Sequence, residues 1–374
     1  MPEARPDSRP PSAAPLTLIA AAFELPAPVA SVSPLGNGII NDTYLVSLTA
    51  APERFVLQRV NTEVFQHPAL VMANIEVLAR HVQARQTADP TAAPWIVPEL
   101  VPARSAPQPW VEVEGQTWRL LTYIDNTRCF DTVTSPAQAR EVGRALGTFH
   151  ALISDLPVSA LADTLEGFHI TPGYLAQFDA VLAAGSPPTE APTLEALRFV
   201  EERRGSMAVL EEAKAAGHLV ERPIHGDPKV NNVLMDRGGT QAVALIDLDT
   251  VKPGLVHYDI GDALRSGCNP LGEEPPDLTA VCFDLDLARA MLEGYLGAAR
   301  GFLTPADLEH LFAAIRLLPL ELGLRFLTDH LAGDHYFKTS YPGQNLHRAR
   351  VQFQLTRSIE DQEQGIRAII QALT

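Results

Sequence analysis

The residues with the clearest chemical potential lie between His225 and Asn232, where the chain reads His-Gly-Asp-Pro-Lys-Val-Asn-Asn. Asp227 precedes Lys229 by two positions and Asn232 by five. Asp247 follows at the end of the next apolar run. A carboxylate base, a cation and two oxygen donors for a metal ion suit transfer of a phosphoryl group, because that reaction depends on positioning and on neutralising charge. The order therefore predicts an enzyme that moves the γ-phosphoryl group of a nucleotide.

Each residue type has a distinct expected role in that chemistry. Asp227 can accept a hydrogen bond from an acceptor hydroxyl and take its proton as the new P–O bond forms. Lys229 can lie against the γ-phosphate and stabilise the developing charge. Asn232 and Asp247 supply an amide oxygen and a carboxylate oxygen, both of which bind Mg²⁺. His225 is expected to be a scaffold for the loop rather than a base.

Taken singly, these residues have ordinary explanations. An Asp-Pro pair usually forms a turn, and a lone Asp after an apolar strand usually caps the next turn. The joint order is hard to obtain from turns alone, so it favours catalytic roles for Asp227, Asn232 and Asp247.

Three further carboxylates follow this motif, and their roles stay open. Asp249 either binds a metal through water or caps the following segment. Asp259 and Asp262 precede an expected helix start, so a structural role is favoured for both, as helix caps or as braces for the loop.

The composition is that of a globular enzyme. The 374 residues are 46% hydrophobic and 20% charged, and this length predicts two lobes or domains. The formal net charge of −16 disfavours binding to nucleic acid or to an anionic membrane surface. We expect a monomer or a homodimer.

Neither the cysteines nor the N-terminus suggests export. Cys129, Cys268 and Cys282 form no CxxC pair, so they predict buried free thiols in a reducing compartment. Residues 1–15 lack the pattern of a signal peptide and are expected to be a disordered tail. The apolar segment 16–23 is too short to span a bilayer. The expected location is the cytoplasm.

The elements expected before residue 126 form a small lobe. Residues rich in β-branched and aromatic types predict strands at 30–35, 43–48, 54–60, 110–113 and 118–124. A helical stripe predicts a helix at 68–86, which begins at Pro68. The turn Gly36-Asn37-Gly38 suits a hairpin. Residues 16–125 are therefore predicted to be an antiparallel-sheet lobe that binds the nucleotide.

Residues 126–374 are predicted to be a larger, mainly helical lobe that carries catalysis and the acceptor site. Ser135-Pro136 has the chemistry of a helix N-terminus. The expected helices are 135–153, 173–184, 191–216, 279–299, 305–332 and 344–372. Two short strands, at 232–235 and 242–246, are expected to flank a hairpin turn at Asp236-Arg237-Gly238-Gly239.

With these motifs in place, the chain resembles the aminoglycoside phosphotransferase and choline kinase superfamily, and the resemblance narrows to the N-acetylhexosamine 1-kinases. It covers nearly the whole chain. The segments that carry it are residues 36–46, 56–65, 229–236, 246–254, 259–262 and 323–337.

The resemblance implies a bilobal α+β protein-kinase-like fold, ATP and Mg²⁺ as cofactors, and the anomeric hydroxyl of an N-acetylhexosamine or a related sugar as acceptor. It places Asp227 at that hydroxyl. It also implies that Arg325 and Tyr336 contact the sugar, since Arg donates several hydrogen bonds and Tyr offers a stacking face and a hydroxyl.

The nucleotide-binding residues depart in part from the family's pattern. The resemblance assigns this role to Gly36, Asn37, Gly38 and Gln58. Gln58 occupies the slot where most kinase-like folds place a lysine, with Glu76 as its expected helical neighbour. Ile39 stands where a related kinase has a histidine that reaches the sugar, and it has no donor to offer.

Two other functions remain as alternatives. One is a kinase of a different small alcohol, of the aminoglycoside, choline or homoserine type. Cationic acceptors of that kind favour an acidic or aromatic cage, and Arg325 argues against them. The other is a nucleotide-binding regulator without turnover, which the missing lysine keeps open.

Overall fold

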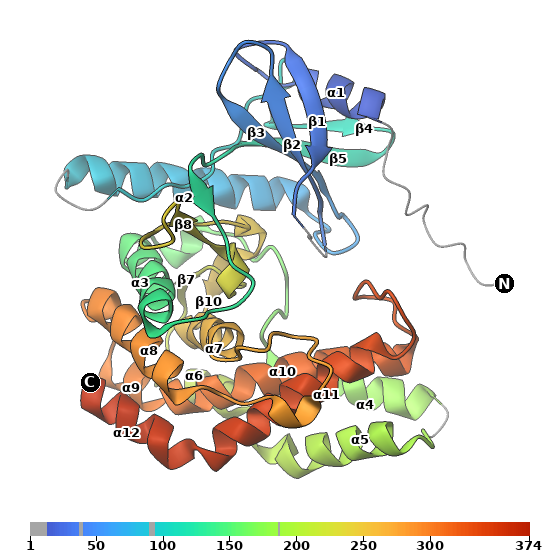
Figure 1. Ribbon diagram of the computed structural model, residues 1–374, viewed down its shortest axis with the longest axis vertical. Helices are drawn as coiled ribbons and strands as arrows, with labels where there is room; N and C mark the ends of the chain where they lie inside the picture. The colour runs from blue at the N-terminus through green and yellow to red at the C-terminus, as the bar shows by residue number, and fades with distance from the viewer. Residues whose placement is uncertain (1–12, 37–39, 90–93, 186–187) are drawn as a thin grey trace. The chain divides into compact units, whose positions relative to one another are not determined.

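The computed structural model describes residues 13–36, 40–89, 94–185 and 188–374 (Figure 1). The chain divides into two compact units, one of residues 1–76 and 98–125 and the other of residues 77–97 and 126–374. The first contains an antiparallel sheet and the second is mainly helical. The predicted α+β class is therefore confirmed.

The first unit is built on a five-stranded antiparallel sheet in the order β1-β2-β3-β5-β4. All five predicted strands are present, with bounds within a few residues of those expected. They are β1 (Val29–Pro34), β2 (Asp42–Leu48), β3 (Arg54–Val60), β4 (Trp110–Val113) and β5 (Gln116–Thr122). Helix α2 (Pro68–Ala88) begins at the predicted proline, and its residues from Val77 onward group with the second unit.

A short helix that the sequence analysis did not predict covers one face of this sheet. Helix α1 spans Ala13–Ala21, so the expected disordered tail is wrong for residues 13–15. Leu16 and Ile19 of this helix are buried in one cluster with Tyr44 and Trp118 of the sheet. Burial against the sheet stabilises a helix that is too short to be stable alone.

The second unit contains the remaining helices and two small sheets. Its helices are α3 (Pro136–Ile153), α4 (Thr171–Ala184), α5 (Ala191–Arg203), α6 (Val209–Ala215), α7 (Val256–Gly267), α8 (Leu285–Ala299), α9 (Pro305–Glu309), α10 (Leu311–Ala332), α11 (Gln344–Asp361) and α12 (Glu363–Leu373). Its strands are β6 (Thr127–Arg128), β7 (Arg222–Ile224), β8 (Val233–Asp236), β9 (Ala242–Leu245) and β10 (Lys252–Gly254). One sheet has the order β6-β8-β9, and the other pairs β7 with β10.

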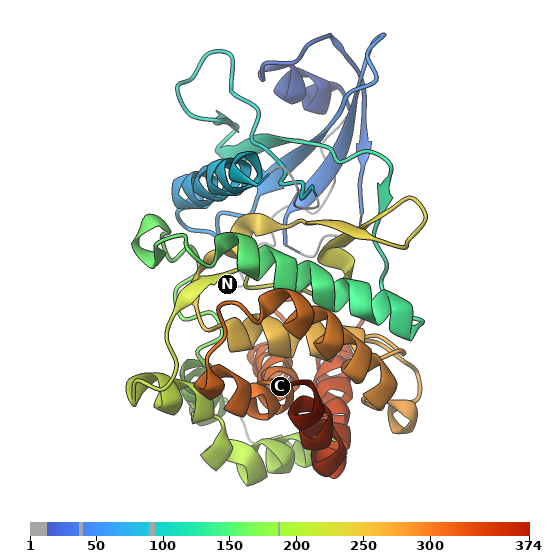
Figure 2. The same ribbon diagram turned by 90° about the vertical axis from the view of Figure 1, so that its left-hand side faces the viewer.

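Helices α3 and α8 pack along each other in the second unit (Figures 1 and 2). Two glycines permit this close approach. A Cβ atom at Gly143 would lie 1.9 Å from the Met291 carbonyl oxygen, and one at Gly294 would lie 2.0 Å from the Arg140 carbonyl oxygen. Helix α3 begins as predicted, because the Ser135 hydroxyl accepts a hydrogen bond from the Gln138 amide at 3.3 Å.

Several predicted helices have other bounds in the structure. The helix expected at 191–216 is broken by a 3-10 turn at Arg204–Ser206, where glycine and serine weaken helical propensity. The expected helix at 279–299 begins only at Leu285, after Asp284 caps it. Those at 305–332 and 344–372 are each two helices, which meet near His310 and Gln362.

Helix α7 was missed, and Asp259 and Asp262 lie inside it rather than before a helix start. Eleven of its twelve residues are buried. The sequence of this helix separates polar from apolar residues, so its periodicity could have revealed it. Asp259 and Asp262 were instead interpreted as residues that precede a helix.

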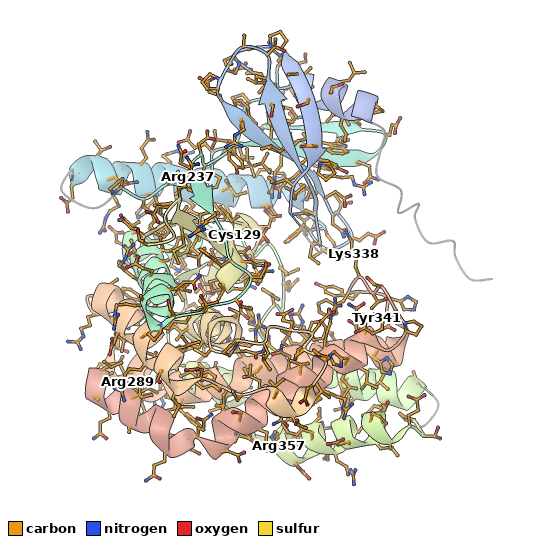
Figure 3. The ribbon with its side chains drawn as sticks, viewed as in Figure 1. Cys129, Arg237, Arg289, Lys338, Tyr341 and Arg357 are labelled. Atoms are coloured by element: carbon orange, nitrogen blue, oxygen red, sulfur yellow. The ribbon has the colours of Figure 1, made fainter. Side chains whose placement is uncertain are left out.

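Cysteine burial differs from the expectation. Cys268 is buried, whereas Cys282 and Cys129, the latter labelled in Figure 3, are exposed free thiols. Among the helices of the described ranges, none is both long and apolar enough to cross a membrane.

Candidate active site

The predicted catalytic residues come together at one end of the β8–β9 hairpin. The loop after β7 carries Asp227 and Lys229 and ends in a 3-10 turn at Val230–Asn232. The hairpin pairs Val233 with Leu245, and the Ile246 amide donates to the Asn232 carbonyl at 2.9 Å. This pairing brings the residue before β8 and the residues after β9 side by side, which explains the long sequence gap between Asn232 and Asp247.

The Asp227 side chain and carbonyl contact Lys229 and Asn232 of the same loop. Lys229 Nζ donates to Asp227 Oδ2 at 2.7 Å. Asn232 Nδ2 donates to the Asp227 carbonyl at 2.8 Å and lies 3.4 Å from Asp227 Oδ2. The Asp227 and Lys229 side chains remain 26% and 25% exposed, so a ligand can reach them.

Asp247 completes this cluster through its charge. Burial by itself lowers the pKa of Lys229, but the carboxylates of Asp227 and Asp247 outweigh that effect and raise the pKa above its usual value. Lys229 therefore stays charged at neutral pH. Asp247 also adopts a left-handed backbone conformation, with φ of 65°, which is strained for a residue other than glycine. Such strain is often found at functional sites.

The possible metal ligands beside Asp227 are not a cluster of His, Cys, Asp and Glu side chains. Across the described ranges, no group of three or more His, Cys, Asp or Glu side chains is arranged to hold a metal ion. The donors near Asp227 are instead the Asp247 carboxylate and the amide oxygen of Asn232, whose Nδ2 is already bonded to the Asp227 carbonyl.

Asp259, on helix α7, holds the backbone of the loop that carries Asp227. Its carboxylate accepts hydrogen bonds from the His225 amide at 2.7 Å and the Gly226 amide at 2.8 Å, and His150 Nε2 lies 2.8 Å away. Burial by itself raises the pKa of Asp259, but the hydrogen bonds and the nearby histidines lower it below its usual value. Of the two roles considered from the sequence, Asp259 takes the bracing one.

His225 and Gly226 are structural parts of the loop. His225 Nε2 donates to the Ile246 carbonyl at 3.0 Å and its Nδ1 accepts from the Asp227 amide at 3.3 Å, so this histidine is a scaffold, as expected. Its pKa is lowered by burial. Gly226 has a φ of +88°, and a Cβ atom there would lie 2.5 Å from the Thr250 carbonyl oxygen. No other residue fits this position without displacing the backbone.

The other two acidic residues have different surroundings. Asp262 pairs with Arg265 within α7 at 2.7 Å. Asp249 lies inside the 3-10 turn Leu248–Thr250 rather than at a helix cap, and it is buried. A water-mediated metal contact of Asp249 stays a prediction.

A buried ion pair connects α10 to the same loop. His169 Nε2 lies 2.7 Å from the Gly226 carbonyl, and His169 Nδ1 lies 2.8 Å from Glu321 Oε1. Thr171 Oγ1 donates to the other Glu321 oxygen at 2.6 Å. Because acceptors face both ring nitrogens, the protonated imidazole fits this position. Burial by itself lowers the pKa of His169, but Glu321 and the carbonyl raise it above its usual value.

This ion pair predicts a pH-dependent contribution to stability. A histidine whose pKa rises on folding stabilises the protein fully below its unfolded value of about 6.5, and the contribution is lost as pH rises through the folded pKa. Glu321→Gln is expected to lower the free energy of unfolding by about 2 kcal/mol near pH 6. The free energy of unfolding of this variant should then fall less than that of the wild type as pH rises. Urea unfolding at several pH values measures both.

A matched control for Glu321→Gln is Glu195→Gln, which alters an exposed pair with Arg350 on the surface. That variant is expected to follow the wild-type pH profile, since exposed pairs contribute little. Parallel profiles for Glu321→Gln and the wild type would contradict a charged His169.

Arg325 lies one helical turn after Glu321 on α10, inside a ring of aromatic side chains. Its guanidinium carbon lies 5.1 Å from the ring centre of Phe168, 4.9 Å from Tyr174, 5.8 Å from Tyr336 and 5.5 Å from Phe337. Distances below about 6 Å are those of cation–π contacts. The structure therefore brings Arg325 and Tyr336 together, and their contact with a sugar stays a prediction.

The same guanidinium lies near the catalytic loop. Burial by itself lowers the pKa of Arg325, while nearby acidic and phenolic groups raise it, and Asp227 is one of them. The Tyr174 phenol is so buried that its pKa rises to about 12. Within the described part of the chain, no protein acceptor takes a hydrogen bond from Arg325. Its donors are thus available to a ligand.

The loop that carries Tyr336 is held by a residue that the sequence analysis did not single out. Asp329 accepts hydrogen bonds from the amides of His335 at 2.9 Å, Tyr336 at 2.8 Å and Phe337 at 2.9 Å. The loop continues through Lys338 and Tyr341 to α11 (Figure 3). The backbone of Tyr336 is thus held in place, while the residue is 44% exposed, so a ligand can reach its ring.

The predicted nucleotide-binding residues belong to the first unit. Gly36 adopts a positive φ of 70°, and Asn37, Gly38 and Ile39 lie outside the described residues. Gln58 has different neighbours from those expected.

Gln58 Nε2 donates to Thr43 Oγ1 at 3.1 Å, and its Oε1 accepts two hydrogen bonds from Arg119. Glu76, the expected neighbour, is exposed to solvent. Gln58 itself carries no charge, but a cation, Arg119, lies directly beside it.

The sequence profile of the phosphotransferase enzyme family matches residues 31–295 of the chain. Among solved structures, an aminoglycoside phosphotransferase from Alicyclobacillus acidocaldarius has a TM-score of 0.61 at 14% identity, covering 100% of this chain and 97% of that one. A microcompartment-associated aminopropanol kinase has a TM-score of 0.64 at 17% identity, covering 94% of this chain and 98% of that one.

A choline kinase from Cryptosporidium parvum is also similar, with a TM-score of 0.56 at 12% identity, and the match covers 90% of this chain and 91% of that one. At such low identities these likenesses establish the fold alone. They confirm the protein-kinase-like architecture that the resemblance implied.

Proposed function

The chain belongs to the phosphotransferase enzyme family and is a small-molecule phosphotransferase, and on that premise we propose that it is an ATP- and Mg²⁺-dependent sugar 1-kinase. Its acceptor is the anomeric hydroxyl of an N-acetylhexosamine or a closely related sugar. The product is the sugar 1-phosphate, and ADP is released.

The observation that carries this proposal is the position of Arg325. A guanidinium beside the catalytic loop, ringed by aromatic side chains and free to donate, favours an acceptor rich in oxygen acceptors. Sugar hydroxyls and an acetamido carbonyl fit that requirement. Choline, aminoglycosides and amino alcohols carry a positive charge, which Arg325 would repel.

The chain's own residues account for the proton and the charge. Asp227 accepts the proton of the anomeric hydroxyl. At the same time the oxygen of that hydroxyl bonds to the γ-phosphorus, and the bond from that phosphorus to the ADP oxygen breaks. An anomeric hydroxyl is more acidic than an ordinary alcohol, so a carboxylate base suffices. Lys229, held charged by Asp227, would stabilise negative charge on the transferred group.

Mg²⁺ fits the donors near this loop. The ion is commonly bound by one or two protein groups together with substrate phosphates. Asn232 and Asp247 would hold it through one amide oxygen and one carboxylate, and when bound it neutralises charge on the phosphate oxygens.

A panel of acceptors tests the proposal. With ATP and Mg²⁺, a coupled assay of ADP release is expected to respond to N-acetylglucosamine or N-acetylgalactosamine and not to choline, homoserine or an aminoglycoside. NMR of the product should show the phosphorus coupled to the anomeric proton. Faster turnover of a cationic alcohol, or phosphate at another carbon, would overturn the assignment.

A further inference from the structure

The sheet of the first unit has two differently covered faces. Phe55 and Leu57 of β3 point into the apolar cluster shared with α1. Gln58 points to the other face, since adjacent strand residues alternate. Met72 of α2 also reaches this second face, where its sulfur lies 3.8 Å from Arg119 Nη1.

Strand register places an arginine directly beside Gln58. In the β3–β5 ladder Gln58 pairs with Arg119, and in the β2–β3 ladder it pairs with Thr43. Arg119 Nε and Nη2 donate to Gln58 Oε1 at 3.0 and 2.7 Å. Arg119 is only 1% exposed, whereas Gln58 is partly exposed. A ligand can therefore meet Gln58 but not Arg119.

These contacts determine the orientation of the Gln58 amide. Two guanidinium donors require the oxygen Oε1 to face Arg119, so the nitrogen Nε2 must face away from it. One Nε2 hydrogen goes to Thr43 Oγ1, and the second hydrogen has no partner among the described residues. Because Oε1 bonds to a cation, the amide is polarised and Nε2 becomes a stronger donor.

We propose that Arg119 is a positioning residue for the nucleotide phosphates, acting through Gln58. The buried guanidinium orients and polarises the Gln58 amide, and Gln58 Nε2 donates to a phosphate oxygen of the nucleotide. In most kinase-like folds one lysine supplies both the positive charge and the hydrogen-bond donor. Here Arg119 of β5 supplies the charge and Gln58 of β3 supplies the donor. This inference rests on the proposed function only for the identity of the nucleotide.

The position of the pair supports this use. Gln58 lies opposite Thr43 of β2, the strand that follows Gly36, and the resemblance assigns nucleotide binding to both Gly36 and Gln58. An amide without a nearby cation would contribute little against phosphate oxygens, whereas hydrogen bonds reinforced by charge are about twice as strong as neutral ones.

The test measures binding of Mg²⁺-ADP to the full chain by titration calorimetry, with no acceptor present. Arg119→Met is expected to weaken binding about tenfold, the equivalent of one charge-assisted hydrogen bond. Arg104→Met is the matched control, since it removes an arginine of the same unit that donates to the Leu25 carbonyl. It is expected to bind ADP as the wild type does.

Two further variants separate positioning from simple destabilisation. Gln58→Glu keeps the shape and can pair with Arg119, so it should fold, but it loses the donor and should weaken ADP binding at least as much. Gln58→Lys combined with Arg119→Met moves the charge to β3 and is expected to recover most of the lost affinity. A purely structural role of Arg119 predicts no such recovery.

The outcomes distinguish this inference from the proposed function. Wild-type affinity for ADP in folded Arg119→Met or in Gln58→Glu would overturn the role of the pair. A double variant no better than Arg119→Met would also overturn it. If these variants behave as expected but no sugar is phosphorylated, the proposed acceptor is wrong and the role of Arg119 stands.

Discussion

Asp227→Asn is expected to lower kcat for sugar phosphorylation by about 10³-fold, within the range that general bases contribute. Asparagine fills the same space and can still accept a hydrogen bond from Lys229, which lies 2.7 Å from the carboxylate in the wild type. It cannot take the acceptor proton. The loss should therefore appear in kcat, with the affinity for Mg²⁺-ADP nearly unchanged.

The fold of this variant should be intact, because the loop is held mainly by other groups. Asp259 binds the His225 and Gly226 amides, and His169 binds the Gly226 carbonyl. Thermal unfolding and the near-ultraviolet circular dichroism spectrum check this. Asp286→Asn, which alters an exposed carboxylate in the first turn of α8, serves as the control. Undiminished sugar-dependent ADP release by Asp227→Asn would remove the proposed base.

The sequence predicted the elements whose signals are local. Strand alternation, the Ser135 cap and the turn before β9 each depend on neighbouring residues, and all three are present in the structure. Helix α1 was missed because its stability comes from burial against the sheet rather than from a polar–apolar stripe. Helix α7 does separate polar from apolar residues, but Asp259 and Asp262 within it were interpreted as residues that precede a helix.

The candidate site shows the same division. The residues of the catalytic loop are close in sequence, so their spacing revealed them. His169 and Glu321 support that loop from distant parts of the chain, and no spacing pattern marks them. Asp329 lies only seven residues before Tyr336, but nothing in the sequence shows that its carboxylate holds the backbone of that segment. Arg119 is an intermediate case. Strand β5, which carries Arg119, and strand β3, which carries Gln58, were both predicted. Only the register that sets the two residues opposite each other was not.

Arg325→Met is expected to lower kcat/KM for the sugar about 100-fold, which corresponds to losing a two-pronged charged hydrogen bond. Methionine keeps much of the length and apolar volume within the ring of Phe168, Tyr174, Tyr336 and Phe337. The site should therefore keep its shape while losing its donors. Mg²⁺-ADP affinity should not change, so initial-rate kinetics and calorimetry together locate the effect at the acceptor.

Two comparisons make this result specific to the acceptor. Arg316→Met removes an arginine from the same helix, where it lies 3.6 Å from Glu360, and should leave sugar kinetics unchanged. Arg325→Lys keeps the charge without the planar fork, so it should recover only part of the loss. If Arg325→Met lowers the melting temperature but not kcat/KM for the sugar, then Arg325 serves only to pack the aromatic rings. The acceptor would then have to be recognised elsewhere in the second unit.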